Sequence, residues 1–176
     1  MENDHGQQEI FRTLPVGYRF SPTNEELVTY YLMNKVLGNP VPPQDVIQEI
    51  DATELYAKPP QNIVTFSSGE REWYFFVHIN EDFFDESISI RIVGDGIGFW
   101  KQTHGPEKPI LNSEGNAFAF KFHFTYFSGS GSNPKKTHWK MEEYRLPMEF
   151  YTAKKFMVSK EGGMGVGKTE KRDGLS

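Results

Sequence analysis

Three basic residues, Arg91, Lys101 and Lys108, lie on or beside two short strand-like runs in the middle of the sequence. In the first run, isoleucines at positions 88, 90 and 92 alternate with other residues, so one side is expected to be buried and Arg91 to point the other way. Cations on a rigid pair of strands can enter a DNA groove and contact phosphates. The alternative is a solvated sheet face with ordinary surface cations, and the spacing alone leaves both interpretations open.

Charge is distributed unevenly along the chain. The 176 residues carry a net charge of -5, which by itself argues against a nucleic-acid partner. Residues 1–87 contain 5 basic and 15 acidic side chains, whereas residues 88–140 contain 7 basic and 3 acidic ones. The central part of the chain therefore has the positive charge that binding of an anion requires.

Several classes of function are disfavoured by what the sequence lacks. It has no cysteine, which excludes disulfides, thiol nucleophiles and zinc sites built on thiolates. Its histidines are scattered, and no nucleophile–base or carboxylate pair stands at a recognisable spacing, so we expect no metal site, no cofactor and no enzyme. No apolar run approaches the roughly 20 residues that span a bilayer, and the start does not resemble a secretory signal, so we expect an intracellular protein without a membrane partner.

Residues 162–169 contain a glycine, four residues and then Gly-Lys-Thr, which satisfies the pattern of a phosphate-binding loop. Such a loop holds nucleotides only between a buried strand and a helix whose N-terminal amides contact the phosphates. Here the preceding run, Phe156 to Val158, is a weak strand, and only seven residues follow Thr169. We therefore expect no nucleotide to bind at the pattern from Gly162 to Thr169.

The elements that position these residues begin with a helix. Thr23 and Glu26 have the spacing of a capping box, and Gly38 can take the left-handed conformation that ends a helix, so a helix is predicted over residues 24–37. Prolines then prevent its continuation. A short strand over residues 46–50 and a brief helix over residues 53–57 are expected next.

Beyond residue 70 the apolar period changes from 3.6 to 2. Strands are predicted over residues 72–79, 117–127 and 137–146, in addition to the two central runs. Strands joined by turns without intervening helices form an antiparallel sheet. We expect one domain over residues 14–150, a disordered N-terminal segment over residues 1–13 and a disordered polar tail over residues 151–176.

Five blocks of the sequence resemble, in order, the motifs of the NAC domain of plant transcription factors. LPVGYRFSPTNEEL (residues 14–27) is similar to the family's opening Leu-Pro-x-Gly-(Phe/Tyr)-Arg-Phe-x-Pro-Thr-(Asp/Asn)-Glu-Glu-Leu, and FWKQT (99–103) to its Tyr-Trp-Lys-Ala-Thr. KKTHWKMEEYRL (135–146) resembles its closing block, while EIDATELY (49–56) and GEREWYFF (69–76) resemble its second and third. The resemblance covers most of the chain.

This resemblance implies an α+β fold, a twisted antiparallel β-sheet flanked by a few helices. It also implies a nuclear regulator of transcription that inserts a β-ribbon into the major groove of double-stranded DNA. The protein would act as a homodimer or as a heterodimer with related NAC proteins. The implied dimer contacts are Leu14, Arg19, Thr23, Glu26 and Tyr31. The implied DNA contacts are Arg91, Phe99, Lys101, Thr103, Lys108, Lys121, Lys135, Lys136 and Lys140.

The sequence departs from the family pattern where DNA contacts are expected. Ile90 replaces the usual asparagine, Phe99 replaces tyrosine, residues 104–107 are one residue longer than the family's turn, and the loop of residues 128–133 lacks cations. Each lost phosphate contact removes close to one counterion from the release on binding, so fewer contacts weaken binding. The alternative function is therefore a dimerisation partner with weakened DNA binding that titrates full-length relatives, which a short tail also favours.

Overall fold

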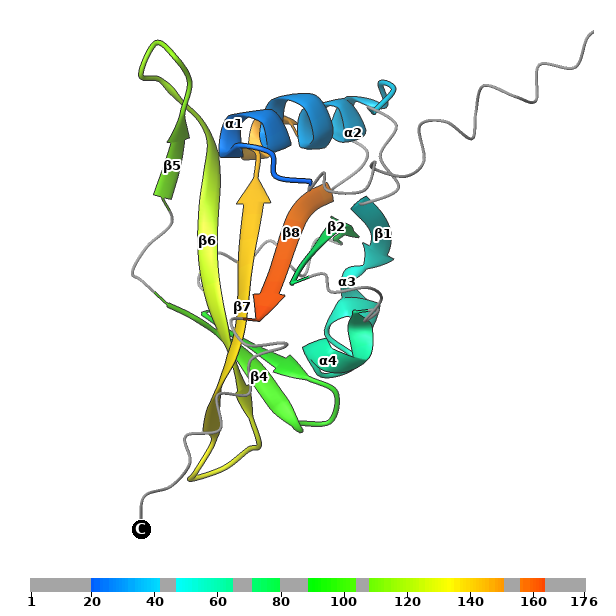
Figure 1. The fold of residues 1–176 in the computed structure, drawn as a ribbon, viewed down its shortest axis with the longest axis vertical. Helices are drawn as coiled ribbons and strands as arrows, with labels where there is room; N and C mark the ends of the chain where they lie inside the picture. The colour runs from blue at the N-terminus through cyan, green and yellow to red at the C-terminus, as the bar shows by residue number, and fades with distance from the viewer. Residues whose placement is uncertain are drawn as a thin grey trace, which may run out of the picture.

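An eight-stranded, predominantly antiparallel β-sheet organises the computed structural model, which describes residues 20–41, 47–64, 71–79, 89–103, 108–150 and 156–163 (Figure 1). The hydrogen-bonded order is β1-β2-β8-β7-β6-β4-β3, with β5 paired to β6, and only β1 and β2 run parallel. The strands are β1 Ile47–Asp51, β2 Glu72–His78, β3 Ile90–Val93, β4 Gly98–Gln102, β5 Lys108–Leu111, β6 Ala117–Ser128, β7 Lys135–Arg145 and β8 Phe156–Gly163.

The predicted helix over residues 24–37 is confirmed. It consists of α1 (Asn24–Glu26), a π-helical segment (Leu27–Leu32) and α2 (Met33–Leu37). The capping box forms: Thr23 Oγ1 accepts the Glu26 N–H at 3.1 Å, and the Glu26 carboxylate accepts the Thr23 N–H at 3.4 Å. Gly38 ends the helix at φ 73°, as its lack of a Cβ allows.

In the described ranges, three further short helical segments accompany the sheet. They are α3 (Ala52–Leu55), α4 (Pro60–Ile63) and a 3-10 turn (Met148–Phe150). The brief helix expected over residues 53–57 therefore begins one residue earlier and ends earlier. Pro60 begins α4, because the amide that proline lacks is one that the first turn of a helix leaves unpaired.

Each face of the sheet carries its own apolar cluster. On one face, Leu55 and Tyr56 from the α3 region pack on buried residues of the central strands that include Trp100 and Phe124. On the other face, the helix of residues 24–37 lies across the upper ends of the long strands and buries Leu27 and other residues against Tyr144 (Figure 1). Beyond that helix the same face carries polar and basic side chains of β4, β5, β6 and β7.

The expected boundary at residue 150 needs correction, because the sheet continues past it. Residues 151–176 were predicted to be a disordered tail, but Phe156–Gly163 forms β8, which pairs with β2 on one side and β7 on the other. The glycines and charged residues of this segment do not predict a strand. A strand that is paired on both sides can form without a strong pattern of its own, because its neighbours stabilise it. Gly162 and Gly163 of the phosphate-loop pattern lie in this ladder rather than in a loop. Residues 1–13, 151–155 and 164–176 lie outside the described residues.

One strand was missed and one glycine explains a close approach. β5 was not predicted, because four residues that include Pro109 give no readable alternation. Gly98 begins β4 where that strand crosses the Tyr126 side chain, and a Cβ at this position would overlap the tyrosine ring and lie 2.7 Å from the Phe127 carbonyl oxygen. Only glycine fits there without displacing its neighbours.

We predict that Gly98→Ala lowers the free energy of unfolding by about 2–3 kcal/mol, because overpacking forces the β3–β4 hairpin away from β6. Urea denaturation followed by fluorescence measures this change. Ser128→Ala, at the exposed residue paired with Gly98, is the control and should change stability little. Equal stability of the Gly98→Ala variant and the parent would contradict the close approach.

Candidate nucleic-acid interface

The strand register places most of the expected DNA contacts on the face of the sheet that also carries the helix of residues 24–37. Lys101 of β4 pairs with Thr125 of β6, which pairs with Lys140 of β7. Residues paired across neighbouring strands have side chains on the same face, so these three form a row. Two further sets of paired residues lie on the same face. Phe99 pairs with Phe127 and Phe127 with Lys136, and Lys108 pairs with Lys121. We call this surface the basic face; its cations are Lys101, Lys108, Lys121, Lys136 and Lys140.

Polar contacts hold part of the basic face in place. Lys140 Nζ donates to Thr125 Oγ1 at 3.0 Å, and Thr103 Oγ1 lies 3.4 Å from the same hydroxyl. Partial burial, together with the nearby Lys136, lowers the pKa of Lys140 below its usual value. Two like charges therefore repel each other here, and a bound anion would reduce that repulsion.

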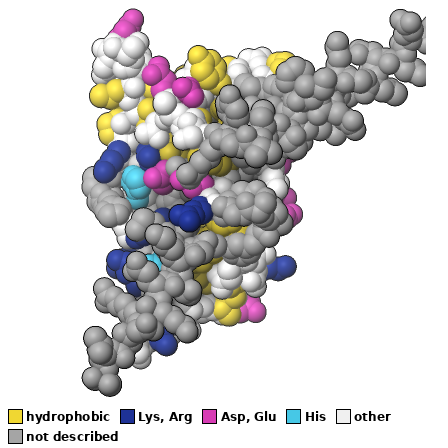
Figure 2. Space-filling model, viewed as in Figure 1, with side chains coloured by type: hydrophobic (Ala, Val, Ile, Leu, Met, Phe, Trp, Pro, Cys, Tyr) yellow, Lys and Arg dark blue, Asp and Glu magenta, His cyan; other side chains and the backbone are white. Residues whose placement is uncertain are grey.

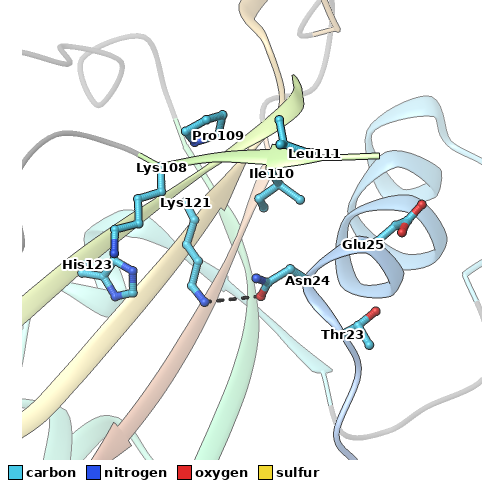
Figure 3. A pocket seen from close by; sticks show the side chains of 9 residues that line it. All are labelled: Thr23, Asn24, Glu25, Lys108, Pro109, Ile110, Leu111, Lys121 and His123. Carbon is cyan, nitrogen blue, oxygen red and sulfur yellow. Dashed lines mark hydrogen bonds between the residues drawn. The ribbon is translucent and has the colours of Figure 1, made fainter. Parts of the chain in front are cut away.

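Beside the helix, the basic face forms an open groove (Figure 3). Lys108, Lys121 and His123 line it from β5 and β6, opposite the start of α1. Lys121 Nζ lies 3.3 Å from the Asn24 side-chain oxygen and 3.3 Å from the Glu142 carboxylate. The latter carboxylate also lies 4.0 Å from His123 Nδ1. Lys121 is therefore already partly neutralised, whereas Lys108 makes no ion pair with the described residues.

The surface view agrees with this arrangement. Figure 2 shows Lys, Arg and His side chains gathered along the left side of the visible face, below the N-terminal helix. Acidic side chains are present beside them, so the visible face is mixed. The described strands of the basic face carry more cations than carboxylates. The excess explains how a chain of net charge -5 can present positive charge on one surface.

Arg91 does not belong to the basic face, and its expected role as a leading DNA contact is corrected. Its guanidinium forms a bidentate ion pair with Glu143, which is 0% exposed, and also donates to the Tyr56 hydroxyl. It lies over the Phe124 ring, 4.4 Å from the centroid. Arg145 completes the cluster by donating to Glu143 Oε2 at 2.8 Å, an oxygen that also accepts from Arg91 at 3.0 Å. A guanidinium held in this way is not available to a phosphate.

The alternation predicted for β3 was correct, but its two sides were assigned the wrong way round. Arg91 pairs with buried Trp100, whereas Ile92 pairs with Phe99 and is 66% exposed. Arg91 and Lys101 consequently point to opposite faces. Arg91 points inward because Glu143 of β7 lies on that side. The ion pair and the hydrogen bonds to this carboxylate offset the loss of hydration of the guanidinium.

The remaining expected contacts are distributed as follows. Phe99 and Thr103 lie on the basic face, Thr103 with its N–H on the His123 carbonyl oxygen at 2.8 Å. Lys135 is exposed near the β6–β7 hairpin but pairs with Ser128, one residue out of phase with Lys136.

Three of the expected dimer residues lie within the described part of the chain. Thr23 and Glu26 cap the helix through each other. Tyr31 is 8% exposed and packs edge-on against Phe20 at 5.5 Å between ring centroids. Leu14 and Arg19 lie outside the described residues. The three that are described therefore already have partners within their own chain.

Sequence reasoning missed the residues that organise both faces. Glu143 could have been recognised, because it shares the inward parity of Met141 in a strand whose apolar residues fix that side. Thr125 and Glu142 carried no comparable signal. Their roles follow from the β6–β7 register, which a sequence does not reveal.

The family described as "No apical meristem (NAM) protein" matches residues 15–146. The chain belongs to this family. NAC domain-containing protein 101 of Arabidopsis thaliana is 38% identical over 139 residues, covering 78% of this chain and 38% of the relative. Transcription factor JUNGBRUNNEN 1 of Arabidopsis thaliana is 39% identical over 145 residues, covering 82% and 49%. NAC domain-containing protein 48 of Oryza sativa subsp. japonica is 37% identical over 134 residues, covering 76% and 41%.

The family assignment confirms the resemblance to the plant NAC domain and agrees with the observed α+β fold. The chain spans less than half of the length of each of these three relatives. Within the described ranges, none of the helices combines the length and the apolar character that crossing a bilayer requires.

We predict that the protein loses stability as the pH falls from about 4.5 toward 2, through Glu143. Burial alone would raise the pKa of this carboxyl, but Arg91 and Arg145 together lower it from 4.5 to about 2. A group with a lowered folded-state pKa stabilises the fold above its unfolded pKa, and this contribution, about 3 kcal/mol, is lost as protonation proceeds. Thermal unfolding across this pH range measures it.

Glu143→Gln should cost about 3–5 kcal/mol at neutral pH, because it leaves two buried guanidiniums without a countercharge, and should flatten the acid dependence. Glu149→Gln, at an exposed residue, is the matched control. An unchanged acid profile in the Glu143→Gln variant would contradict the assignment.

Proposed function

We propose that the chain is a sequence-specific, DNA-binding regulator of transcription that acts in the nucleus as a dimer. The observation that carries this proposal is the placement of five lysines on one face of the sheet, in a chain that is acidic overall. Relatives named as transcription factors, among them NAC transcription factor 56 and JUNGBRUNNEN 1, support it.

The geometry suggests how a duplex would be held. A two-stranded ribbon fits the major groove, which is about 12 Å wide. The β3–β4 hairpin lies at the end of the sheet path, so it would enter the groove while cations farther along the face contact the phosphates on either side. Lys101 lies on the hairpin itself, and Lys136 and Lys140 lie on β7, two strands away. Phosphate contacts set the position of the protein, and contacts to base edges specify the sequence.

Burial of Arg91 changes the expected strength of this interaction. With Arg91 engaged by Glu143 and Lys121 engaged by Glu142, fewer cations remain for phosphates than the resemblance implied. Each phosphate contact contributes about 0.9 to the slope of log affinity against log salt. This observation favours the second candidate function, in which the chain pairs with full-length relatives, binds DNA weakly and titrates them.

The dimer would be isologous and built from the opening segment, with Arg19 of one protomer pairing with Glu26 of the other. In an isologous interface each contact is made twice, which multiplies the contribution of a pair that would be weak alone. The Glu26 carboxylate has several acceptor positions. One accepts the Thr23 N–H, and the others can accept hydrogen bonds from an arginine as well. The capping hydrogen bonds between Thr23 and Glu26 would thus position Glu26 for the dimer contact and would not compete with it.

We predict that Lys101→Ala lowers DNA affinity and reduces the magnitude of the salt slope by about 0.9. A mobility-shift titration over a series of salt concentrations measures both quantities. Lys58→Ala removes the same charge from an exposed residue between α3 and α4, near the opposite face, and serves as the matched control. A salt slope near zero for the parent protein would exclude DNA binding, and equal slopes for both variants would place the interface elsewhere.

We further predict that Arg19→Ala and Glu26→Gln each shift the protein from dimer toward monomer, because each removes one side of a pair made twice across the axis. Size-exclusion chromatography with light scattering measures the mass. Glu25→Gln, at the exposed neighbouring residue, is the control for charge at the helix start. If both variants keep the parent's mass, the proposed interface is wrong.

A further inference from the structure

The hairpin that carries Lys101 also exposes apolar side chains on the same face. Ile90 is 46% exposed and Ile92 is 66% exposed, although both are β-branched residues on a strand. Next to them Phe99 and Phe127 are stacked, with ring planes 3° apart and centroids 5.2 Å apart. We call these four residues the apolar strip. Large apolar side chains that are exposed next to one another are typical of an interaction site.

The apolar strip and the cations are arranged in ordered rows across the sheet. One row reads Ile90, Lys101, Thr125 and Lys140 from β3 to β7. The next reads Ile92, Phe99, Phe127 and Lys136, and the β6–β7 pairing shifts between the two rows. Both rows begin with an isoleucine at the β3 end and finish with a lysine on β7. Neighbouring strands are about 4.8 Å apart, so each row spans about 14 Å from apolar end to cation.

We infer that the apolar strip reads thymine methyl groups in the major groove of the bound duplex. This inference rests on the proposed function and names what part of the DNA that face recognises. The C5 methyl of thymine is the apolar group that a base pair displays in the major groove. A ribbon whose leading strand presents isoleucines to the groove, with lysines behind it at phosphate distance, matches the order in which a duplex presents methyls and phosphates.

A duplex fits this surface better than an apolar protein partner does. A protein that covered Ile92 and Phe99 would also cover Lys101 and Lys136, which make no ion pair with described residues, and would strip them of water without compensation. DNA satisfies both kinds of group at once. The departure of Ile90 from the family pattern then has a physical reading, since an apolar residue replaces a polar one at the end of the first row.

The test exchanges thymine for uracil, which removes only the methyl and keeps the hydrogen-bonding edge. Duplexes are first selected by the parent protein from a random-sequence library, and the selected duplex is then made with thymine or with uracil. We expect the uracil form to bind about fourfold more weakly for each methyl contacted, the equivalent of about 0.8 kcal/mol per buried carbon group. Equal affinity for the two forms overturns the inference.

Variants assign the effect to the apolar strip. Ile92→Ser should bind thymine and uracil duplexes with more nearly equal affinity while keeping the parent's salt slope, because no cation is removed. Leu37→Ser, at a helix residue that is 57% exposed, is the matched control and should keep the parent's discrimination. Full discrimination by Ile92→Ser also overturns the inference, and circular dichroism verifies that the variant is folded.

The two proposals fail in different ways. If no duplex is selected and affinity does not respond to salt, the proposed DNA binding is wrong and the inference falls with it. If duplexes are selected with a steep salt slope but uracil makes no difference, DNA binding stands and only the methyl contact is wrong.

Discussion

A buried carboxylate connects the parts of this structure. Glu143 lies near the C-terminal end of β7 with no exposed surface, and it accepts hydrogen bonds from Arg91 of β3, from Arg145 of its own strand and from Tyr56 beside α3. Buried ion pairs contribute little net stability over apolar packing, but they are costly to break and they restrict alternative arrangements. The cluster therefore fixes how β3 and α3 lie against the sheet. Because Arg91 is drawn inward, the isoleucines that flank it face outward, and the composition of the open face follows from this one pairing.

The two faces of the sheet divide the work of folding and binding. One face is covered by the α3 and α4 region and contains aromatic residues such as Trp100 together with the buried ion cluster. The other carries the capped helix of residues 24–37 at one end and lysines of β4 to β7 along the rest. Long strands make this possible, since β6 and β7 extend from beneath the helix across the rest of the face. Their pairing shifts once, between Thr125 and Phe127, and both sides of the shift keep lysines on this face.

Elements with a strong local signal could be predicted from the sequence, and the arrangement between them could not. The helix start at Thr23, its end at Gly38 and the alternation of β6 are all local properties, and each was found. Lys101 was placed correctly on a strand, but the direction of Arg91 depended on a carboxylate 52 residues away. Periodicity tells which residues share a side of a strand. It does not tell which side is buried when one side carries isoleucines and the other carries an arginine and a valine, as in β3. β8 was missed for a related reason, because its neighbours in the sheet rather than its own residues define it.

The position of β8 has a consequence for the order of assembly. This strand lies between β2 and β7, and its partners are separated from it by very different lengths of chain: Phe75 of β2 pairs with Ser159, as does Glu143 of β7. In the strand order, β8 alone joins the β1–β2 pair to the strands from β7 to β3, and without it each part would have an unpaired edge of the kind that can recruit another chain. High contact order of this kind slows folding and lengthens the exposure of such edges. During synthesis on the ribosome, the segment up to residue 150 would therefore wait, incompletely closed, for its final strand.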